Sequence, residues 1–227
     1  MRIIRFLPVF LAVIFIFGFS YQAQAYQDFC PQHDTNTYMK RKINKTRVFK
    51  GTTNDFTEHL KGHSRSEERG WIGGFVTYKH PLLETDFEFK YEHVNLGPNK
   101  YCVRMTHVRV YFVQNPQVFL PTDYKKTSCE YKQILKHEKR HLKALKDFHK
   151  EYAPRFEAHL GRVARGLPVP NPVPYQNVGL VIEQLEEHYV TEFADFIIKA
   201  TEILDKRQQK IDSPQEYRGV FKRCDNW

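Results

Sequence analysis

Apolar and polar residues alternate along the chain between residues 71 and 113. The segments 73–80, 86–94 and 101–113 carry this period of two and are rich in Val, Phe, Tyr and Thr. Such alternation is typical of half-buried antiparallel strands that place their apolar side chains on one face. The pattern therefore predicts one small antiparallel sheet, which the segment 119–124 closes.

The spacing of apolar residues becomes helical after this sheet. Ser128, or Thr127 before it, can cap a helix that begins near Cys129. Pro154 either kinks this helix or marks the start of another. The apolar positions that recur at helical spacing are Tyr131, Ile134, Leu135, Leu142, Leu145 and Phe148.

A second long helix is expected after the proline-rich segment 166–174, which predicts a stiff and extended connector. This helix covers residues 177–210, and its apolar stripe can pack on the first helix. The sequence Asp212-Ser213-Pro214 ends it, and a short helix follows up to Cys224. The expected fold class is α+β, with a small antiparallel sheet followed by two packed helices.

Residues 1–25 have the features of a secretory signal peptide. Arg2 and Arg5 precede an apolar run over residues 6–19, and Ala-Gln-Ala at 23–25 offers a cleavage site. The alternative is a membrane anchor, but the run is shorter than the roughly 20 residues that cross a bilayer. We expect cleavage, no membrane anchor in the mature chain, and a secreted or periplasmic location.

The segment 26–70 is polar and is expected to be rich in loops. It contains one strand-like patch at 46–50, and residues 61–70 indicate an exposed turn or a short helix. We expect the folded α+β domain to comprise residues 71–227.

The chain has four cysteines, at positions 30, 102, 129 and 224, and none of them forms a CxxC pair. An even number in an exported chain favours two disulfides over a thiolate metal site. Four cysteines allow three pairings. We expect Cys30–Cys102, which ties the N-terminal strand to the sheet, and Cys129–Cys224, which ties the tail to the first long helix.

The mature chain is basic. Without residues 1–25 it keeps 33 Lys and Arg against 26 Asp and Glu, a formal charge of +7. In an exported protein this charge fits an anionic envelope or cell wall. The lysines are scattered and accompany no nucleic-acid motif, so we do not expect nucleic-acid binding.

The helical segment contains His137-Glu138-Lys139-Arg140-His141, which matches the pattern HExxH. Residues four apart share one helix face about 6 Å apart, so His137 and His141 can bind one zinc ion. Glu138 can then act as the general base of a hydrolase. The alternatives are a chance match and two core histidines. Both rings, however, continue the apolar line of the helix, where unligated imidazoles are costly, while Lys139 and Arg140 are expected to point away.

The third metal ligand remains open at this stage. His149 lies eight residues beyond His141 and cannot reach the same ion without a break in the helix. If the second helix packs antiparallel to the first, its C-terminal end lies near His137. Asp212, at the end of that helix, is the first candidate for the third ligand, and Glu216 and Glu202 are the alternatives. Glu216 also fits a capping box that begins at Ser213.

The order of these features resembles a bacterial family of secreted zinc-dependent peptidases of the HExxH type. The resemblance covers roughly residues 71–224 and rests on the cysteine-bearing strand, Leu120-Pro121, the HExxH helix and the sequence Gln208-Gln209-Lys210-Ile211-Asp212. It implies a zincin-like fold, zinc held by His137 and His141, and Glu138 as catalytic base. The chain departs from the family in lacking a His-Gly pair after the long helix.

The expected function is that of an exported zinc metallopeptidase acting on a peptide or protein substrate. In this class Tyr217 could hydrogen-bond a tetrahedral intermediate, although a tyrosine packed in the core is the simpler expectation. The main alternative is a non-catalytic envelope protein that uses the same helix as a structural metal site or to bind a partner. A third class is a basic module that binds cell wall or nucleic acid without zinc.

Overall fold

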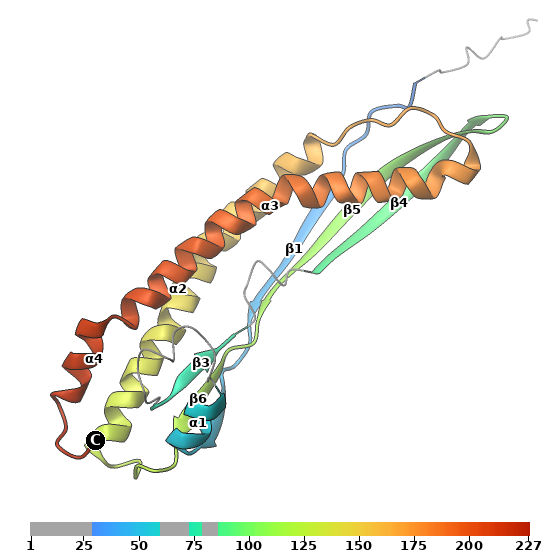
Figure 1. Cartoon of the computed structure of the whole chain (residues 1–227). Coiled ribbons are helices and arrows are strands. Elements are labelled where there is room, and N and C mark those ends of the chain that lie inside the picture. The colour runs from blue at the N-terminus through green and yellow to red at the C-terminus, as the bar shows by residue number, and fades with distance from the viewer. Residues whose placement is uncertain (1–28, 60–72, 79–85) are drawn as a thin grey trace, which may run out of the picture.

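The computed structural model describes residues 29–59, 73–78 and 86–227 (Figure 1). The expected signal peptide and the segment 61–70 lie outside the described residues. Among the helices in the described part, none is both long enough and apolar enough to cross a membrane. The molecule is elongated, with the C-terminus and the start of the first long helix at one end.

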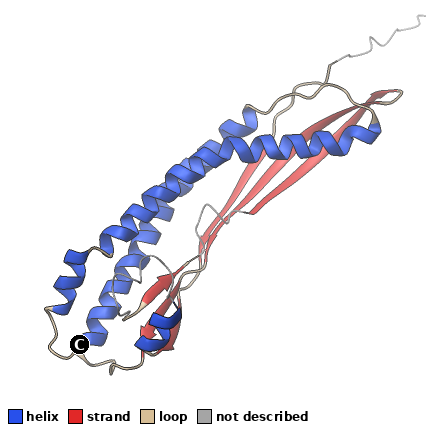
Figure 2. Ribbon diagram, in the orientation of Figure 1, coloured by secondary structure: helices blue, strands red, loops and turns tan. Residues whose placement is uncertain are grey.

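The architecture is α+β, with two small sheets and two long helices (Figure 2). The strands are β1 (Asn36–Ile43), β2 (Arg47–Gly51), β3 (Phe75–Thr77), β4 (Asp86–Gly97), β5 (Lys100–Gln114) and β6 (Gln117–Pro121). The helices are α1 (Thr53–His59), α2 (Cys129–Arg165), the short 3-10 helix η1 (Tyr175–Asn177), α3 (Val178–Ile211) and α4 (Pro214–Phe221).

The strands form two three-stranded sheets, in the orders β1-β5-β4 and β2-β6-β3. Pairs β4–β5 and β3–β6 are antiparallel, as the alternation predicts. The expectation of one purely antiparallel sheet was wrong, because β1 and β2 run parallel to β5 and β6. The expectation that segment 26–70 is mostly loops was also wrong, because it supplies β1, β2 and α1. Strands β1 and β2 are polar edge strands, which show little alternation of apolar residues.

The two long helices cover one face of the β1-β5-β4 sheet and run antiparallel to each other. The pairing of Tyr189 with Leu160 and of Arg207 with Glu151 fixes their register. Between helices and sheet lies an aromatic core, in which the Phe156 ring contacts the rings of Phe112, Phe193 and Phe196. This core holds α2 rigidly against the sheet.

The bounds of the helices follow the expected signals. Ser128 caps α2, because its side chain accepts a hydrogen bond from the Tyr131 backbone N–H at 3.2 Å. Pro154 lies inside α2, which continues past it to Arg165, so no separate helix starts there. The break at Ser213-Pro214 separates α3 from α4, and the Ser213 side chain accepts from the Glu216 backbone N–H.

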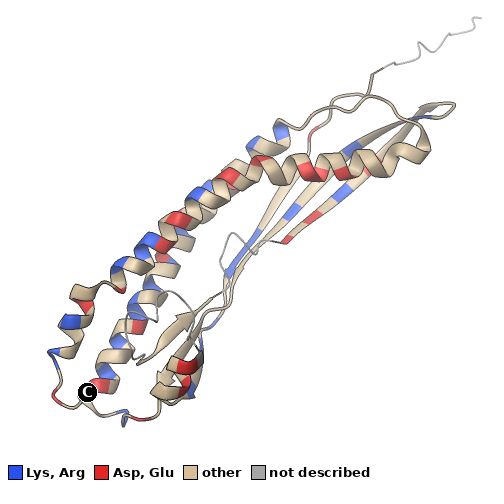
Figure 3. Cartoon of the chain, in the orientation of Figure 1, with Lys and Arg blue, Asp and Glu red and all other residues tan. Residues whose placement is uncertain are grey.

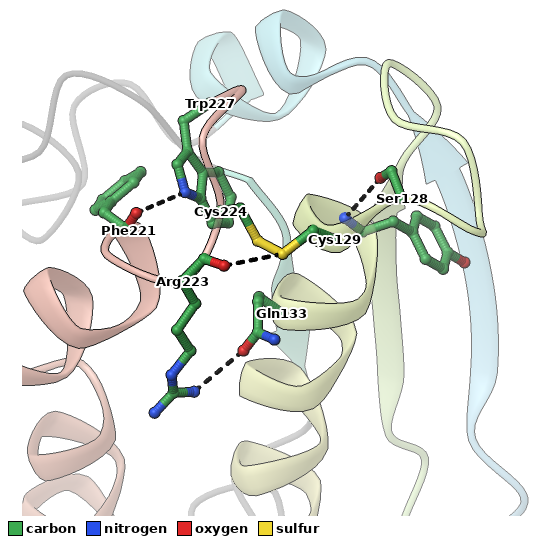
Figure 4. Close-up of a disulfide and its surroundings, with 8 residues drawn as sticks. Ser128, Cys129, Gln133, Phe221, Arg223, Cys224 and Trp227 are labelled. Carbon is green, nitrogen blue, oxygen red and sulfur yellow. Dashed lines mark hydrogen bonds between the residues drawn. A yellow bond between two sulfur atoms is a disulfide. The ribbon is translucent and has the colours of Figure 1, made fainter.

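Both expected disulfides are confirmed. Cys30–Cys102 links the residues before β1 to β5, and Cys129–Cys224 links the start of α2 to the tail that follows α4. Around the second bridge, Trp227 donates to the Phe221 carbonyl and Arg223 donates to the Gln133 side chain (Figure 4). The tail is therefore fastened to the same end of α2 that carries the HExxH sequence.

The aromatic core predicts a large loss of stability on truncation. Phe156 is fully buried, so Phe156→Ala should lower the free energy of unfolding by about 3–5 kcal/mol through lost burial and a cavity. Leu180, whose side chain is 55% exposed, is the matched control, and Leu180→Ala should change it by less than about 0.5 kcal/mol. Urea unfolding with the disulfides intact measures both, and equal losses would contradict the assigned core.

Candidate metal centre

The HExxH side chains lie on the inner face of α2. His137, Glu138 and His141 are buried, in line with the core residues Ile134 and Leu145. One helical turn separates the two histidines, and their Nε2 atoms are 3.2 Å apart. The helix therefore presents two ring nitrogens to one point inside the protein.

The third group at this point is the carboxylate of Asp212. This residue is the C-cap of α3, where the chain turns before Ser213, and the turn directs its side chain toward α2. Its Oδ1 atom lies 3.3 Å from Nε2 of His137 and 3.2 Å from Nε2 of His141. The antiparallel packing of the two long helices thus brings together residues 71 or more positions apart.

The two rival acids lie elsewhere. Glu216 accepts a hydrogen bond from Arg140 at 2.6 Å, and Glu202 is exposed on α3. His149 donates to the Phe112 carbonyl at 3.1 Å and stacks on that ring, away from the cluster. Within the described residues, the only cluster of three or more His, Cys, Asp or Glu that could hold a metal ion is His137, His141 and Asp212.

The spacing and chemistry of the three atoms fit a metal ion. Ligands about 2.0–2.1 Å from a tetrahedral zinc stand about 3.3–3.4 Å from one another. The three separations here are 3.2, 3.2 and 3.3 Å, and the donors are two imidazole nitrogens and one carboxylate oxygen. The cluster can therefore bind a metal ion through three protein ligands.

Gln208 orients His141. Its Oε1 atom lies 2.6 Å from Nδ1 of His141, and its Nε2 donates to the His141 carbonyl at 3.4 Å. Because an amide oxygen only accepts, Nδ1 carries the ring proton and Nε2 keeps its lone pair for a metal. Gln208 was not among the site residues predicted from the sequence, although it lies one turn before Asp212 on the same face of α3.

Arg140 lies against His137, so the expectation that it points away was wrong. Its guanidinium is 3.1 Å from Nδ1 of His137 and also donates to Glu216. A guanidinium only donates, so Nδ1 accepts and the neutral ring carries its proton on Nε2, facing Asp212. Binding of a metal at Nε2 therefore requires this proton to leave and Arg140, which is partly exposed, to turn aside.

Glu138 is buried beside the cluster, with one oxygen uncompensated. Among the described residues, nothing hydrogen-bonds its Oε2 atom. Burial raises the pKa of Glu138 to about 8, although the charge of His141 opposes this. A Cβ atom at Gly74, just before β3, would lie 3.4 Å from Oε1 of Glu138 and 2.9 Å from the Phe119 carbonyl oxygen. Glycine thus lets β3 approach the carboxyl group closely.

The two histidines differ in their electrostatics. Burial lowers the pKa of His137 more than its hydrogen bond to Asp212 raises it. Burial also acts to lower the pKa of His141, but Asp212, Glu138 and Gln208 together raise it. Tyr217 is only partly buried. Its hydroxyl donates a hydrogen bond to Oδ1 of Asp212 at 3.0 Å and so helps to hold this carboxylate in place.

The contact of Gln208 with His141 predicts a loss of metal affinity on its removal. Gln208→Leu should weaken metal binding, measured with zinc as the probe ion, by about 10–100-fold, because His141 then loses the acceptor that fixes its tautomer. Gln209→Leu, at the exposed neighbouring position, should leave the affinity unchanged. Competition with a chromogenic chelator measures both affinities, and equal values would remove Gln208 from the site.

Comparisons with protein-family models, with curated proteins and with solved structures returned no match. Any functional assignment therefore depends on the HExxH sequence, on the geometry of the cluster and on the residues around it.

Proposed function

We propose that the chain is an exported zinc metallopeptidase with a zincin-like catalytic centre. The observation that carries this proposal is the position of Glu138, a buried carboxyl group with an unpartnered oxygen beside three converging ligand atoms. Buried carboxyl groups without hydrogen bonds are destabilising and occur where function requires them.

The ligand set supports a catalytic rather than a structural metal. Structural zinc sites usually have four protein ligands, whereas catalytic sites have three and leave one position open. Here two histidines and one carboxylate converge, and no fourth His, Cys, Asp or Glu joins them among the described residues. Two imidazoles and a carboxylate are a donor set that suits zinc.

In this proposal the residues of the chain have separate roles. A bound zinc ion would supply Lewis acidity, which polarises a peptide carbonyl and makes water easier to deprotonate. His137, His141 and Asp212 hold the ion, and Gln208 and Tyr217 hold two of these ligands in place. Glu138, whose ionised form the positive charge of a bound metal would favour over burial, accepts a proton from the attacking water at its free oxygen and passes it to the nitrogen of the leaving amine.

Two further features support an exported peptidase. Both disulfides fit an oxidising extracellular compartment. The resemblance to secreted HExxH peptidases implies the same substrate class, peptides or proteins.

A structural metal site is the second candidate, and the position of Asp212 favours it. The three ligand atoms join the first third of α2 to the end of α3, so an ion among them would clip the two helices together. This role needs no base, and Glu138 would then be a buried residue without a catalytic task. The two functions differ in what they predict for Glu138.

Metal binding should depend on Asp212. The mature protein should bind about one zinc per chain, and free zinc at 100 times Kd should raise the free energy of unfolding by about 2.7 kcal/mol. At the same zinc concentration Asp212→Asn should gain no more than about 1.4 kcal/mol, since its affinity falls at least tenfold. Asp205→Asn, about two turns before Asp212 on α3, is the control. Equal stabilisation of both variants would exclude Asp212 as a ligand.

Hydrolysis should depend on Glu138. Glu138→Gln should keep the zinc and the fold but lower kcat by at least about 100-fold in a screen of labelled peptides, because the amide cannot accept the proton. Glu130→Gln changes another buried glutamate of α2 and should leave kcat unchanged. Hydrolysis by the Glu138 variant at the normal rate would exclude this base. Absence of turnover in a zinc-loaded native protein would favour the structural site.

A further inference from the structure

Strands β1 and β2 form a basic edge that lies outside the candidate metal centre. Between Asn36 and Gly51 the chain has six Lys and Arg residues and no Asp or Glu. All six are exposed, and several are visible in blue along this edge (Figure 3). The residues of the basic edge are Lys40, Arg41, Lys42, Lys45, Arg47 and Lys50.

The two strands occupy corresponding positions in their sheets. β1 is the outer neighbour of β5, and β2 is the outer neighbour of β6, so they follow one another along one side of the molecule. In the described part of the chain no strand pairs with their outer sides. Their outward backbone N–H and C=O groups are therefore placed to receive a further strand.

Side chains flank this edge on both faces. Met39 is buried under the helices, so alternation places Arg41 on the same face and Lys40 and Lys42 on the opposite face. The Lys40 ammonium lies over the Tyr111 ring, 5.7 Å from its centroid. A strand added here would meet positive charge above and below its plane.

The edge also exposes large apolar side chains. Tyr38 is 60% exposed, Val48 is 58% exposed and Phe49 is 38% exposed. Side chains of this size between lysines give an incoming chain apolar contact as well as charge. A basic edge that served only to prevent aggregation would have no need of them.

We propose that the β1–β2 edge docks an extended acidic segment of another protein by strand addition. An extended polypeptide supplies both the donors and the acceptors that an open strand edge requires, whereas the phosphates of a nucleic acid or a lipid headgroup only accept. Edges of two copies of this chain repel each other through their lysines. The acidic part of the chain's own α3, with five Asp and Glu and no Lys or Arg between residues 178 and 198, is helical and cannot supply the strand.

The docking edge and the metal centre are separate regions of the molecule. β2 is separated from β3, the strand next to Glu138, by β6, a distance of about 10 Å between the outer strands. Docking therefore needs neither zinc nor Glu138. The proposed docking is therefore independent of the proposed peptidase activity.

The test uses the mature protein and a short fluorescein-labelled peptide of alternating glutamate and valine, with binding measured by fluorescence anisotropy. Lys40→Gln/Lys42→Gln/Lys45→Gln should weaken binding by about tenfold or more. The control, Lys132→Gln/Lys146→Gln/Lys150→Gln, removes three equally exposed charges from α2 and should change Kd less than about twofold. Circular dichroism and thermal unfolding establish that both variants fold.

Further measurements test whether binding depends on backbone pairing, on the class of partner or on metal. The same peptide with every backbone nitrogen methylated keeps its charge but loses the N–H donors on both of its edges, and it should bind about tenfold more weakly. Equal binding of the methylated peptide, or equal loss in the α2 control, would overturn the proposal. Tighter binding of duplex DNA or of phosphatidylglycerol vesicles, with the same dependence on the edge lysines, would assign the edge to that partner instead. Addition of EDTA should leave peptide binding unchanged.

Discussion

Burial of polar groups on the inner face of α2 is the constraint on which the structure depends. Helix α2 packs its apolar stripe under the sheet and against α3, and the same stripe carries His137, Glu138 and His141 into the interior. Imidazole and carboxyl groups that lose water must find partners or lose stability. At the end of α3, Asp212 and Gln208 supply hydrogen-bond partners for the two histidines. The Cys129–Cys224 bridge fastens the tail to the start of α2. Glu138, beside these ligands, keeps one buried oxygen without a hydrogen-bond partner in the described structure.

The sequence predicted the parts of the fold that follow from strong local signals. Ser128, Pro214 and the periodicity of the long helices placed their bounds within a residue or two, and the antiparallel return of α3 brought Asp212 beside His137. The pairing of the cysteines was also predicted correctly. These features depend on backbone propensity and on chain geometry, which a sequence expresses directly.

Other features depend on long-range packing and could not be predicted. The parallel pairing of β1 with β5 joins residues about 70 positions apart, and β1 buries only Met39, so its alternation is weak. Arg140 turns back to His137 because Glu216, on another helix, accepts its second N–H. Gln208 acts through a buried hydrogen bond that is not visible as a motif. The Lys and Arg residues of the basic edge are clustered in the sequence, but that these residues flank the open edges of two sheets depends on the pairing of β1 with β5 and of β2 with β6.

The central claim is that His137, His141 and Asp212 together hold a zinc ion, and X-ray absorption at the zinc edge tests it most directly. Measured on the mature protein with one equivalent of zinc, the spectrum should show nitrogen and oxygen neighbours at about 2.0–2.1 Å with the outer-shell scattering of two imidazole rings. His141→Ala should remove one imidazole contribution, whereas His149→Ala should leave the spectrum unchanged. A spectrum with sulfur neighbours, or one with only water oxygens and no imidazole scattering, would contradict the account.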